Sequence, residues 1–315
     1  MAKYMFIHAR EGGAIEEDED QSTESMWDRY PRSEGEERAQ ILSGLARDAL
    51  RRHFGQEALT LAQEAQAIYE ALGAAIPGVE MAETIFLIGS ALVELHREKE
   101  AAELLNQAIA LQRDCSYQFV EDTLRTQGVW YGAAGEYELG LKSFLEAAQS
   151  DDINGDYEFL AMDLYVAGEF TFKLGRYKEA VDLFTQCRQI LVKREDLPLI
   201  SRTDWNLAEC YMKLGLNESA LSSAEQCYSI ASLRKDDQYM CKGSFTKAKA
   251  HMALGDFDSA ANELFEADCM ASSASDWELT LEIQKEYQVL HLNLNQFEAA
   301  QKTEARIATI REILG

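Results

Sequence analysis

Gly135-Glu-Tyr-Glu-Leu-Gly140 is the first of five similar stretches that recur every forty residues. The others are Gly175-Arg-Tyr-Lys-Glu-Ala180, Gly215-Leu-Asn-Glu-Ser-Ala220, Gly255-Asp-Phe-Asp-Ser-Ala260 and Asn295-Gln-Phe-Glu-Ala-Ala300. Each begins with glycine or asparagine, which accepts the left-handed backbone conformation at a helix end. Each ends with a small residue, which lets two helices approach closely. A fixed long period of this kind predicts a solenoid of helix pairs.

Weaker copies upstream extend the array to about seven units. His53 and His96 stand at the turn, and Ala58 and Ala101 follow in the small-residue column. The units open near Ala39, Ala82, Glu121, Ala161, Ser201, Cys241 and Leu281. Their eighth and twenty-seventh places form two columns of mostly small residues, as close packing of antiparallel helices requires. The columns hold Ala46, Gly89, Gly128, Gly168, Ala208, Ala248 and Gln288, and then Ala65, Ala108, Ala147, Cys187, Cys227, Ala267 and Ile307. Both exceptions fall in the last unit, which has no following neighbour.

These columns and the Gly-x-aromatic turn resemble the tetratricopeptide repeat, a helix-turn-helix unit of about 34 residues. The forty-residue spacing is similar to the long-helix branch of that superfamily, which includes peptide-sensing bacterial regulators of the Rap type and several cargo or polarity adaptors. The resemblance covers about residues 39 to 314. It implies an all-α fold, a right-handed superhelical solenoid of about seven helix pairs. Because the shared residues are structural, they predict the fold and leave the function open.

Composition favours the same architecture. Hydrophobic residues make up 47% of the 315, and there are three prolines. Two of these, Pro77 and Pro198, fall between the expected units, where helices must stop. Each unit of a solenoid packs on its neighbours, so chain length alone does not divide it into domains. We therefore predict one elongated domain over residues 39–315 and an N-terminal arm over residues 1–38.

The arm contains the acidic run Glu16-Glu-Asp-Glu-Asp20. Such a run is typically disordered and solvated. The alternative is that the arm folds back over the solenoid, with Tyr4, Phe6 and Trp27 as anchors and its acids facing a basic channel. Both interpretations stay open.

Charge and motifs argue against several function classes. The net charge of −25 disfavours binding to nucleic acid or to an anionic membrane surface, and no apolar run reaches the roughly 18 residues of a membrane span. The sequence contains no phosphate loop, nucleophile elbow or dinucleotide fingerprint. We therefore expect no enzymatic activity and no cofactor. Carboxylate pairs such as Asp151-Asp152 and Asp236-Asp237 are expected to be solvated loop charges.

The cysteines predict free thiols in a reducing cytoplasm. Two of them occupy the small-residue packing column, and no Cys-x-x-Cys pair occurs. Buried thiols are therefore expected in place of disulfides. The six are Cys115, Cys187, Cys210, Cys227, Cys241 and Cys269. The five histidines are scattered without ligand spacing, so we expect no metal site.

The first helix of each unit is expected to line the concave face. In the tetratricopeptide family the second, fifth, sixth, ninth, twelfth and thirteenth places face the channel. In this chain those places hold seven acidic residues and nine basic ones, and the basic ones are Arg47, Arg51, Arg125, Lys173, Arg202, Lys213, Lys242, Lys249 and Lys285. An acidic chain thus keeps a slight basic excess on one face. The alternative is that these cations pair with glutamates along the helices.

Cations and aromatic residues coincide in the units near Ser201 and Cys241. The candidate ligand-binding residues are Tyr165, Arg202, Trp205, Asn206, Glu209, Lys213, Lys242, Phe245 and Lys249. A ring buries apolar area while cations and an amide hold carboxylate and backbone groups. We therefore predict capture of a peptide with an acidic or C-terminal carboxylate group. The competing interpretation places Trp205 and Phe245 in the core between adjacent helices.

Two function classes remain. The first is a non-catalytic adaptor or scaffold that binds a protein or peptide on the concave face. The second is a peptide-sensing regulator resembling the Rap type, switched by a ligand in the channel. The expected partner in both is a protein or peptide, with no nucleic acid and no membrane. At the C-terminus, Ile307, Ile310, Ile313 and Leu314 either cover the final helix pair or associate with a second copy of the chain.

Overall fold

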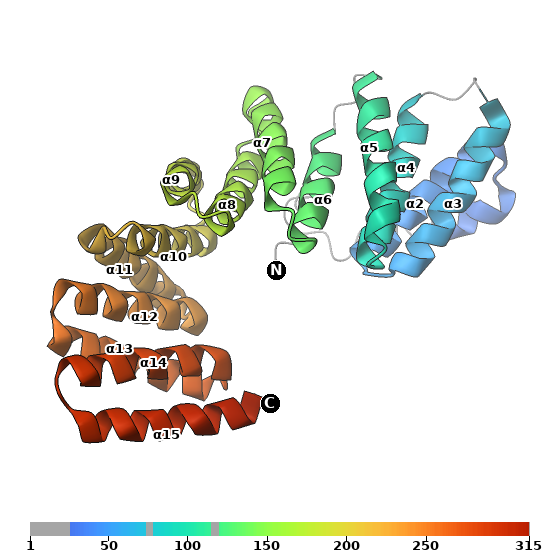
Figure 1. Cartoon of the computed structure of the whole chain (residues 1–315). Coiled ribbons are helices and arrows are strands. Elements are labelled where there is room, and N and C mark those ends of the chain that lie inside the picture. Colours follow the sequence, from blue (N-terminus) through green and yellow to red (C-terminus); the bar gives the residue numbers. More distant parts are fainter. Residues whose placement is uncertain (1–25, 74–77, 115–119, 315) are drawn as a thin grey trace. The chain divides into compact units, whose positions relative to one another are not determined.

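The computed structural model describes residues 26–73, 78–114 and 120–314, and these residues form helices joined by short turns (Figure 1). None of them lies in a β-strand. The chain divides into two compact units, Met1–Val166 and Ala167–Gly315. The boundary falls inside one helix, α8 (Tyr157–Lys173). The prediction of an all-α array of helix pairs is confirmed.

Unit 1 contains three helix pairs and the first part of α8. The elements are η2 (Tyr30–Arg32), α2 (Gly35–Arg51), α3 (Gly55–Leu72), α4 (Gly78–Glu94), α5 (Glu98–Asp114), α6 (Val120–Ala133) and α7 (Tyr137–Asn154). Helices α2, α4 and α6 pack against the helices that follow them. Leu42, Leu45 and Tyr69 are among the residues of the shared core of the first two pairs.

Unit 2 continues the same alternation after the second part of α8. The elements are α9 (Tyr177–Arg194), α10 (Leu197–Lys213), α11 (Asn217–Arg234), α12 (Asp237–Leu254), α13 (Phe257–Ser273), α14 (Trp277–Asn293) and α15 (Phe297–Leu314). Helix α12 packs against α10, α11, α13 and α14, so the first helices of consecutive pairs touch. Leu264, Ile283 and Leu290 are fully buried in this unit.

The turn within each pair adopts the conformation that the sequence predicts. Gly135, Gly175, Gly215 and Gly255 have φ values of 80°, 76°, 72° and 81°, and Asn295 has φ 58°. At the first of these turns the Glu136 N–H donates to the Tyr131 carbonyl at 2.8 Å, which closes the helix end. His53 and His96 occupy the same conformation at φ 62° and 57°. Every turn of the forty-residue column therefore uses a left-handed residue.

A second left-handed column lies between the pairs. Gly155, Glu195, Lys235 and Ser275 have φ values of 74°, 58°, 56° and 55°. Only one of these four is glycine, and for this reason residue type did not reveal the column. Non-glycine residues adopt this conformation at a cost of about 1 kcal/mol, which the closing hydrogen bonds and the packed helices offset.

The first helices begin about one turn before the expected openings, except α6. At α10, α12 and α14 this early start coincides with a column of capping aspartates. The carboxylates of Asp196, Asp236 and Asp276 accept the N–H of the third residue that follows, at 3.1, 3.3 and 3.0 Å. This is the standard N-cap arrangement. The expectation that Asp236 is merely a solvated loop charge is therefore wrong.

Proline placement also differs from the expectation. Pro198 lies in the first turn of α10 and not between units. A proline is tolerated there, because the N–H that it lacks would have no partner inside the helix. Pro77 lies outside the described residues.

The small-residue columns are where the helices of a pair approach most closely. All fourteen positions are buried except Gln288. A Cβ atom at Gly128 would lie 2.6 Å from the ring of Phe144, and one at Gly168 would lie 2.7 Å from the ring of Phe184. Each glycine thus leaves room for an aromatic ring from the second helix of its pair.

The described part of the N-terminal arm packs on the first helix pair. Residues 26–29 are helical, and Met26 and Tyr30 contact the core of that pair. The Tyr30 hydroxyl accepts from Arg38 at 2.6 Å and donates to Glu64 of α3 at 2.9 Å. The acidic run at residues 16–20 and the anchors Tyr4 and Phe6 lie outside the described residues.

Five cysteines fall in the described part of the chain, and all five are free thiols. Cys187, Cys210, Cys227 and Cys241 are buried, whereas Cys269 is exposed. Burial raises the pKa of Cys187, Cys210 and Cys227 to about 12, so these thiols are poor nucleophiles. Cys115 lies outside the described residues.

The apolar residues at the C-terminus were expected either to cover the final helix pair or to contact a second copy of the chain, and the structure separates them into two groups. Ile307 and Ile310 are buried in the last pair, whereas Ile313 and Leu314 are exposed. The final pair therefore covers only part of its own apolar surface.

Candidate functional site

The candidate site lies in unit 2, where the first helices α10 and α12 pack side by side. Arg202, Trp205, Asn206, Glu209 and Lys213 belong to α10. Lys242, Phe245 and Lys249 belong to α12. Tyr165, on α8, belongs to unit 1 and is buried there, with 7% of its surface exposed.

Four side chains of α10 and α12 form a compact cluster of two cations and two rings. The Lys242 Nζ atom lies 4.2 Å from the Trp205 ring centroid and 4.8 Å from that of Tyr239. The Arg202 guanidinium carbon lies 5.5 Å from the Tyr239 centroid. The two rings meet edge to face, with centroids 6.2 Å apart. These distances are those of cation–π and aromatic pairs. We call Arg202, Trp205, Tyr239 and Lys242 the cation–aromatic cluster.

Neither cation of the cluster is neutralised by a carboxylate. Within the described residues, Arg202 and Lys242 form no ion pair, and their contacts are those with the rings. The Arg202 Nε atom is buried without a hydrogen-bond partner. Burial lowers the pKa of Lys242, and the charge of Arg202 lowers it further, while the more distant charges of Asp276 and Glu169 oppose this shift. A half-buried pair of cations without a counterion is costly, and an anion bound between them would remove that cost.

The remaining cation of α12 is already paired. The Lys249 ammonium donates to Glu209 of α10 at 2.7 Å, and the Thr246 hydroxyl donates to the same oxygen at 2.7 Å. Lys249 also lies 4.9 Å from the ring of Phe245, which is buried with 6% exposed. The charge of Lys249 is thus neutralised by Glu209, and its ammonium group also contacts the Phe245 ring. Phe245 itself belongs to the hydrophobic core that α12 shares with α13 and α14, as the competing interpretation expected.

The other two α10 residues have different surroundings. Asn206 is half-buried and Lys213 is exposed. In the described part of the chain Lys213 makes no ion pair. The structure therefore brings Arg202, Trp205 and Lys242 together, adds the separate Glu209–Lys249 pair, and places Lys213 in solvent near the end of α10.

Tyr239 was missed by the sequence interpretation. The expected unit opened at Cys241, but α12 begins at Asp237 because Asp236 caps it. The tyrosine is therefore the third residue of the helix and lies on the face that carries Lys242. Burial raises its pKa, and the charge of Arg202 opposes that rise. The signal that could have found Tyr239 is the column of capping aspartates.

Some of the nine cations that were expected to face the channel form ion pairs with acidic residues of the chain. Arg125 is fully buried and binds three aspartates. In unit 1, Arg47 forms an ion pair with Glu83. Both cations are thus paired with acids, and these acids lie mostly on neighbouring helices and not along the same helix. Among the candidate residues the cations without a carboxylate partner are Arg202, Lys213 and Lys242, within the part of the chain that the structure describes.

The described residues show neither a metal site nor a membrane-spanning helix. They contain no group of three or more histidine, cysteine or acidic side chains arranged to hold a metal ion. None of the helices that they form combines the length and apolar character that crossing a bilayer demands.

Comparison with known proteins agrees with this architecture. Residues 82–115 and 205–232 match the family model described as tetratricopeptide repeat. The apo form of RapI is similar at a TM-score of 0.68 and 15% identity, over 95% of this chain and 82% of that chain. A signal-transduction ATPase with a tetratricopeptide-repeat sensor from Pyrococcus horikoshii gives a TM-score of 0.71 at 14% identity, over 94% of this chain and 47% of that one. The apo quorum sensor NprR from B. thuringiensis gives 0.58 at 10% identity, over 95% and 100%. No curated protein sequence matches the chain significantly.

These similarities show the fold of the chain. The chain folds as a tetratricopeptide-type array of helix pairs. Its cation–aromatic cluster lies on two first helices, α10 and α12, of that array.

Proposed function

We propose that this chain is a non-catalytic adaptor that binds a protein or peptide on the face shared by α10 and α12. One observation supports this most: Arg202 and Lys242 lie half-buried and without a carboxylate partner among the described residues, in a chain of net charge −25. With 55 acidic residues available, a purely structural cation would be expected to have a partner. Proteins of this fold bind partners mainly through the concave face of the first helices. The free thiols favour a cytoplasmic protein.

The proposed ligand group is a carboxylate, either an acidic side chain or the C-terminus of a peptide. Arg202 and Lys242 supply donors for charge-assisted hydrogen bonds. Trp205 is half-buried and presents ring surface for an apolar side chain next to that group. A typical groove-bound peptide of this kind binds at micromolar concentration, about −8 kcal/mol.

A pool of random-sequence peptides tests the proposal directly. Each peptide is made with a free C-terminal carboxylate and as the amide, and retention on immobilised protein is measured. We expect retention of acidic or carboxylate-ended peptides by the native chain and a loss of about a hundredfold or more in Arg202→Glu/Lys242→Glu, because each of the two charged hydrogen bonds contributes about 1.5–3 kcal/mol.

The matched control is Lys213→Glu/Lys285→Glu, which reverses two exposed lysines on first helices. This control changes the net charge by the same amount and should retain most of the binding. Equal retention by the native chain and the cluster variant, with both folded by circular dichroism, would show that the cluster is not the site.

The second candidate function is a regulator switched by a peptide in the channel. The similarity to RapI and to the quorum sensor NprR favours it. A regulator should change its dimensions when it binds, whereas a scaffold should change them much less. Small-angle scattering of the native chain with and without the retained peptides distinguishes the two: an unchanged radius of gyration at saturation supports the adaptor.

Two further proposals concern the ends of the chain. The acidic run at residues 16–20 would compete with the ligand for Arg202 and Lys242, so deletion of residues 1–25 should tighten peptide binding. Unchanged affinity after this deletion would exclude the competition. Ile313 and Leu314 would support self-association, and sedimentation of Ile313→Ser/Leu314→Ser against the native chain tests that proposal.

A further inference from the structure

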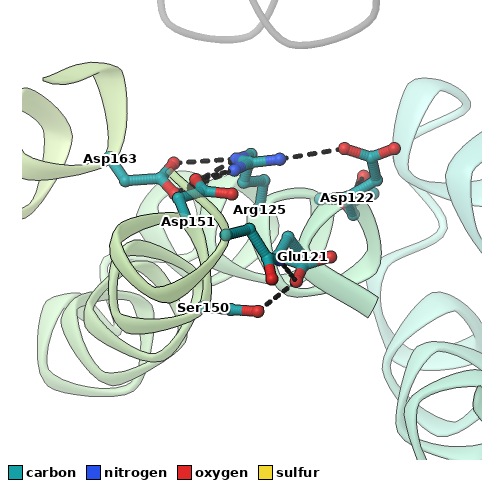
Figure 2. A network of polar contacts seen from close by, with 8 residues as sticks. Glu121, Asp122, Arg125, Ser150, Asp151 and Asp163 are labelled. Atoms are coloured by element: carbon teal, nitrogen blue, oxygen red, sulfur yellow. Dashed lines mark hydrogen bonds and ion pairs between the residues drawn. The ribbon is translucent and has the colours of Figure 1, made fainter. Parts of the chain in front are cut away.

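A buried polar network joins α6, α7 and α8 within unit 1 (Figure 2). Its centre is Arg125 of α6, which has no exposed side-chain surface. The Nε atom donates to Asp163 of α8 at 2.9 Å, and Nη1 donates to Asp122 at 2.9 Å. Nη2 donates to Asp163 at 3.1 Å and also to Asp151 of α7. One guanidinium thus holds three carboxyl groups.

The buried part of this network carries more acid than base. Asp122 is 30% exposed and remains solvated, whereas Asp151 and Asp163 are 2% and 0% exposed. One positive charge therefore faces two buried carboxyl groups. Arg125 is the only cation that forms an ion pair with either of them in the described residues. A single proton on the pair would make the buried part neutral.

The two buried carboxyl groups are close enough to share that proton. The Oδ2 atoms of Asp151 and Asp163 both accept from the same Arg125 Nη2 atom, so the two carboxyl groups lie side by side on one donor. Two ionised carboxylates at such a distance repel strongly, so one of them is protonated in the stable arrangement. We propose that Asp151 and Asp163 hold one proton between them in the folded chain, and that its loss loosens the attachment of α8 to α6 and α7.

The surrounding groups favour retention of the proton. Burial raises the pKa of Asp163 well above its usual range, although Arg125 opposes the rise. Burial also raises the pKa of Asp151, and the negative charge of Asp156 adds to it. On the other side of Asp151, the Glu121 carboxylate accepts from Ser150 and has a second oxygen without a partner. Asp122, Asp156 and Glu121 are all acids, so none of them supplies a positive charge that could neutralise the pair in place of the proton.

The sign of the effect follows from proton counting. The folded pair binds one proton that free aspartates, with pKa about 3.9, release at lower pH. A raised pKa in the folded state stabilises the fold at low pH, and this contribution is lost as pH rises through the folded pKa of the pair. Unit 1 should therefore lose stability over a pH range above that of ordinary carboxyl groups.

Carboxyl-carbon NMR of the full chain tests the proposal without any substitution. We expect Asp151 and Asp163 to titrate as a coupled pair, with one step well above the ordinary aspartate range and the other closer to it. Titration of both carboxyl groups at or below pH 4 would overturn the shared proton.

The variant Asp163→Asn tests the consequence for stability. It leaves one buried aspartate for one arginine, so no proton is needed. In the native chain, the folding equilibrium constant should fall by up to about tenfold per pH unit between the unfolded and the folded pKa, where only the folded pair holds the proton, and this fall should be absent in Asp163→Asn.

The matched control is Asp122→Asn, which removes a carboxylate of the same network that is not one of the pair. It should keep the pH dependence of the native chain. An equal pH dependence in the native chain and Asp163→Asn would overturn the proposal. If Asp163→Asn does not fold, the NMR titration decides alone.

Discussion

Arg125 in unit 1 and the pair Arg202 and Lys242 in unit 2 show two fates of a cation on a first helix. Arg125 is fully buried among three aspartates. Arg202 and Lys242 are half-buried against aromatic rings and have no carboxylate partner in the described residues. On the same helix-pair frame, a cation can thus be neutralised by buried acids or remain unpaired and available to bind an anion. The neighbouring helices decide between the two.

The repeat register makes the contrast sharper. Counted from the expected openings, Arg125 occupies the fifth place of its unit, and Trp205 and Phe245 occupy the same place in theirs. Where an arginine fills this place, acids on α7 and α8 neutralise it. Where Trp205 fills it, the ring supports Lys242 from the next first helix. The fifth place of the repeat therefore holds a buried structural arginine in unit 1 and a residue of the candidate binding site in unit 2.

Removal of the buried arginine should have the largest effect. Arg125→Met leaves two buried carboxyl groups without their cation, so the free energy of unfolding should fall by about 3–5 kcal/mol. Arg47→Met breaks only a partly exposed ion pair and should cost at most about 1 kcal/mol. Urea unfolding of both variants measures the difference. Equal losses would contradict the structural role of Arg125.

Close packing gives the next largest effect. A Cβ at Gly128 would lie 2.6 Å from the Phe144 ring, so Gly128→Ala should destabilise unit 1 by about 1–3 kcal/mol. Ala208 is one of the equivalent positions in unit 2, and Ala208→Gly should cost about 1 kcal/mol through helix propensity alone. Phe144→Leu in the Gly128→Ala background should restore part of the loss. Failure of that rescue in thermal unfolding would show that the ring contact is not the cause.

Neutralising the cluster cations should change stability little and binding much. In Arg202→Met/Lys242→Met the free energy of unfolding should change by less than about 1 kcal/mol, because the loss of the cation–π contacts is offset by removal of the desolvation cost of two unpaired charges. Retention of carboxylate-ended peptides should be lost. A loss of stability as large as that of Arg125→Met would remove the distinction between the two regions.

The smallest effect is the alkaline pH dependence of Lys242. Its pKa is lowered by burial, so the folded chain binds fewer protons than the unfolded chain between the two pKa values. Stability should therefore rise with pH in this range, by less than the about 1.4 kcal/mol per pH unit that one proton allows. The difference between the native chain and Lys242→Met isolates this contribution from other alkaline groups. A native chain that follows Lys242→Met at every pH would show that Lys242 is not desolvated.

Two of the sequence predictions depended on neighbours that the register alone does not reveal. Arg125 was placed in the channel because its register position faces the channel in tetratricopeptide repeats. The acids that bury it, Asp151 and Asp163, lie 26 and 38 residues away along the chain. Asp151 was expected to be a solvated loop charge and is instead buried in the network. Tyr239 was missed because the helix start depends on the Asp236 cap, which is a local interaction that the column of openings did not include.

The sequence by itself determined the helix pairs, the left-handed turns at Gly135 and its equivalents, and the small-residue columns. These features repeat every forty residues because each unit meets the same local backbone and steric requirements. The tertiary structure alone decided which cations are neutralised and which ring fills the space beside each glycine. Those outcomes depend on side chains from helices far apart in sequence, and the free energy of a buried charge is set by whichever groups surround it after folding.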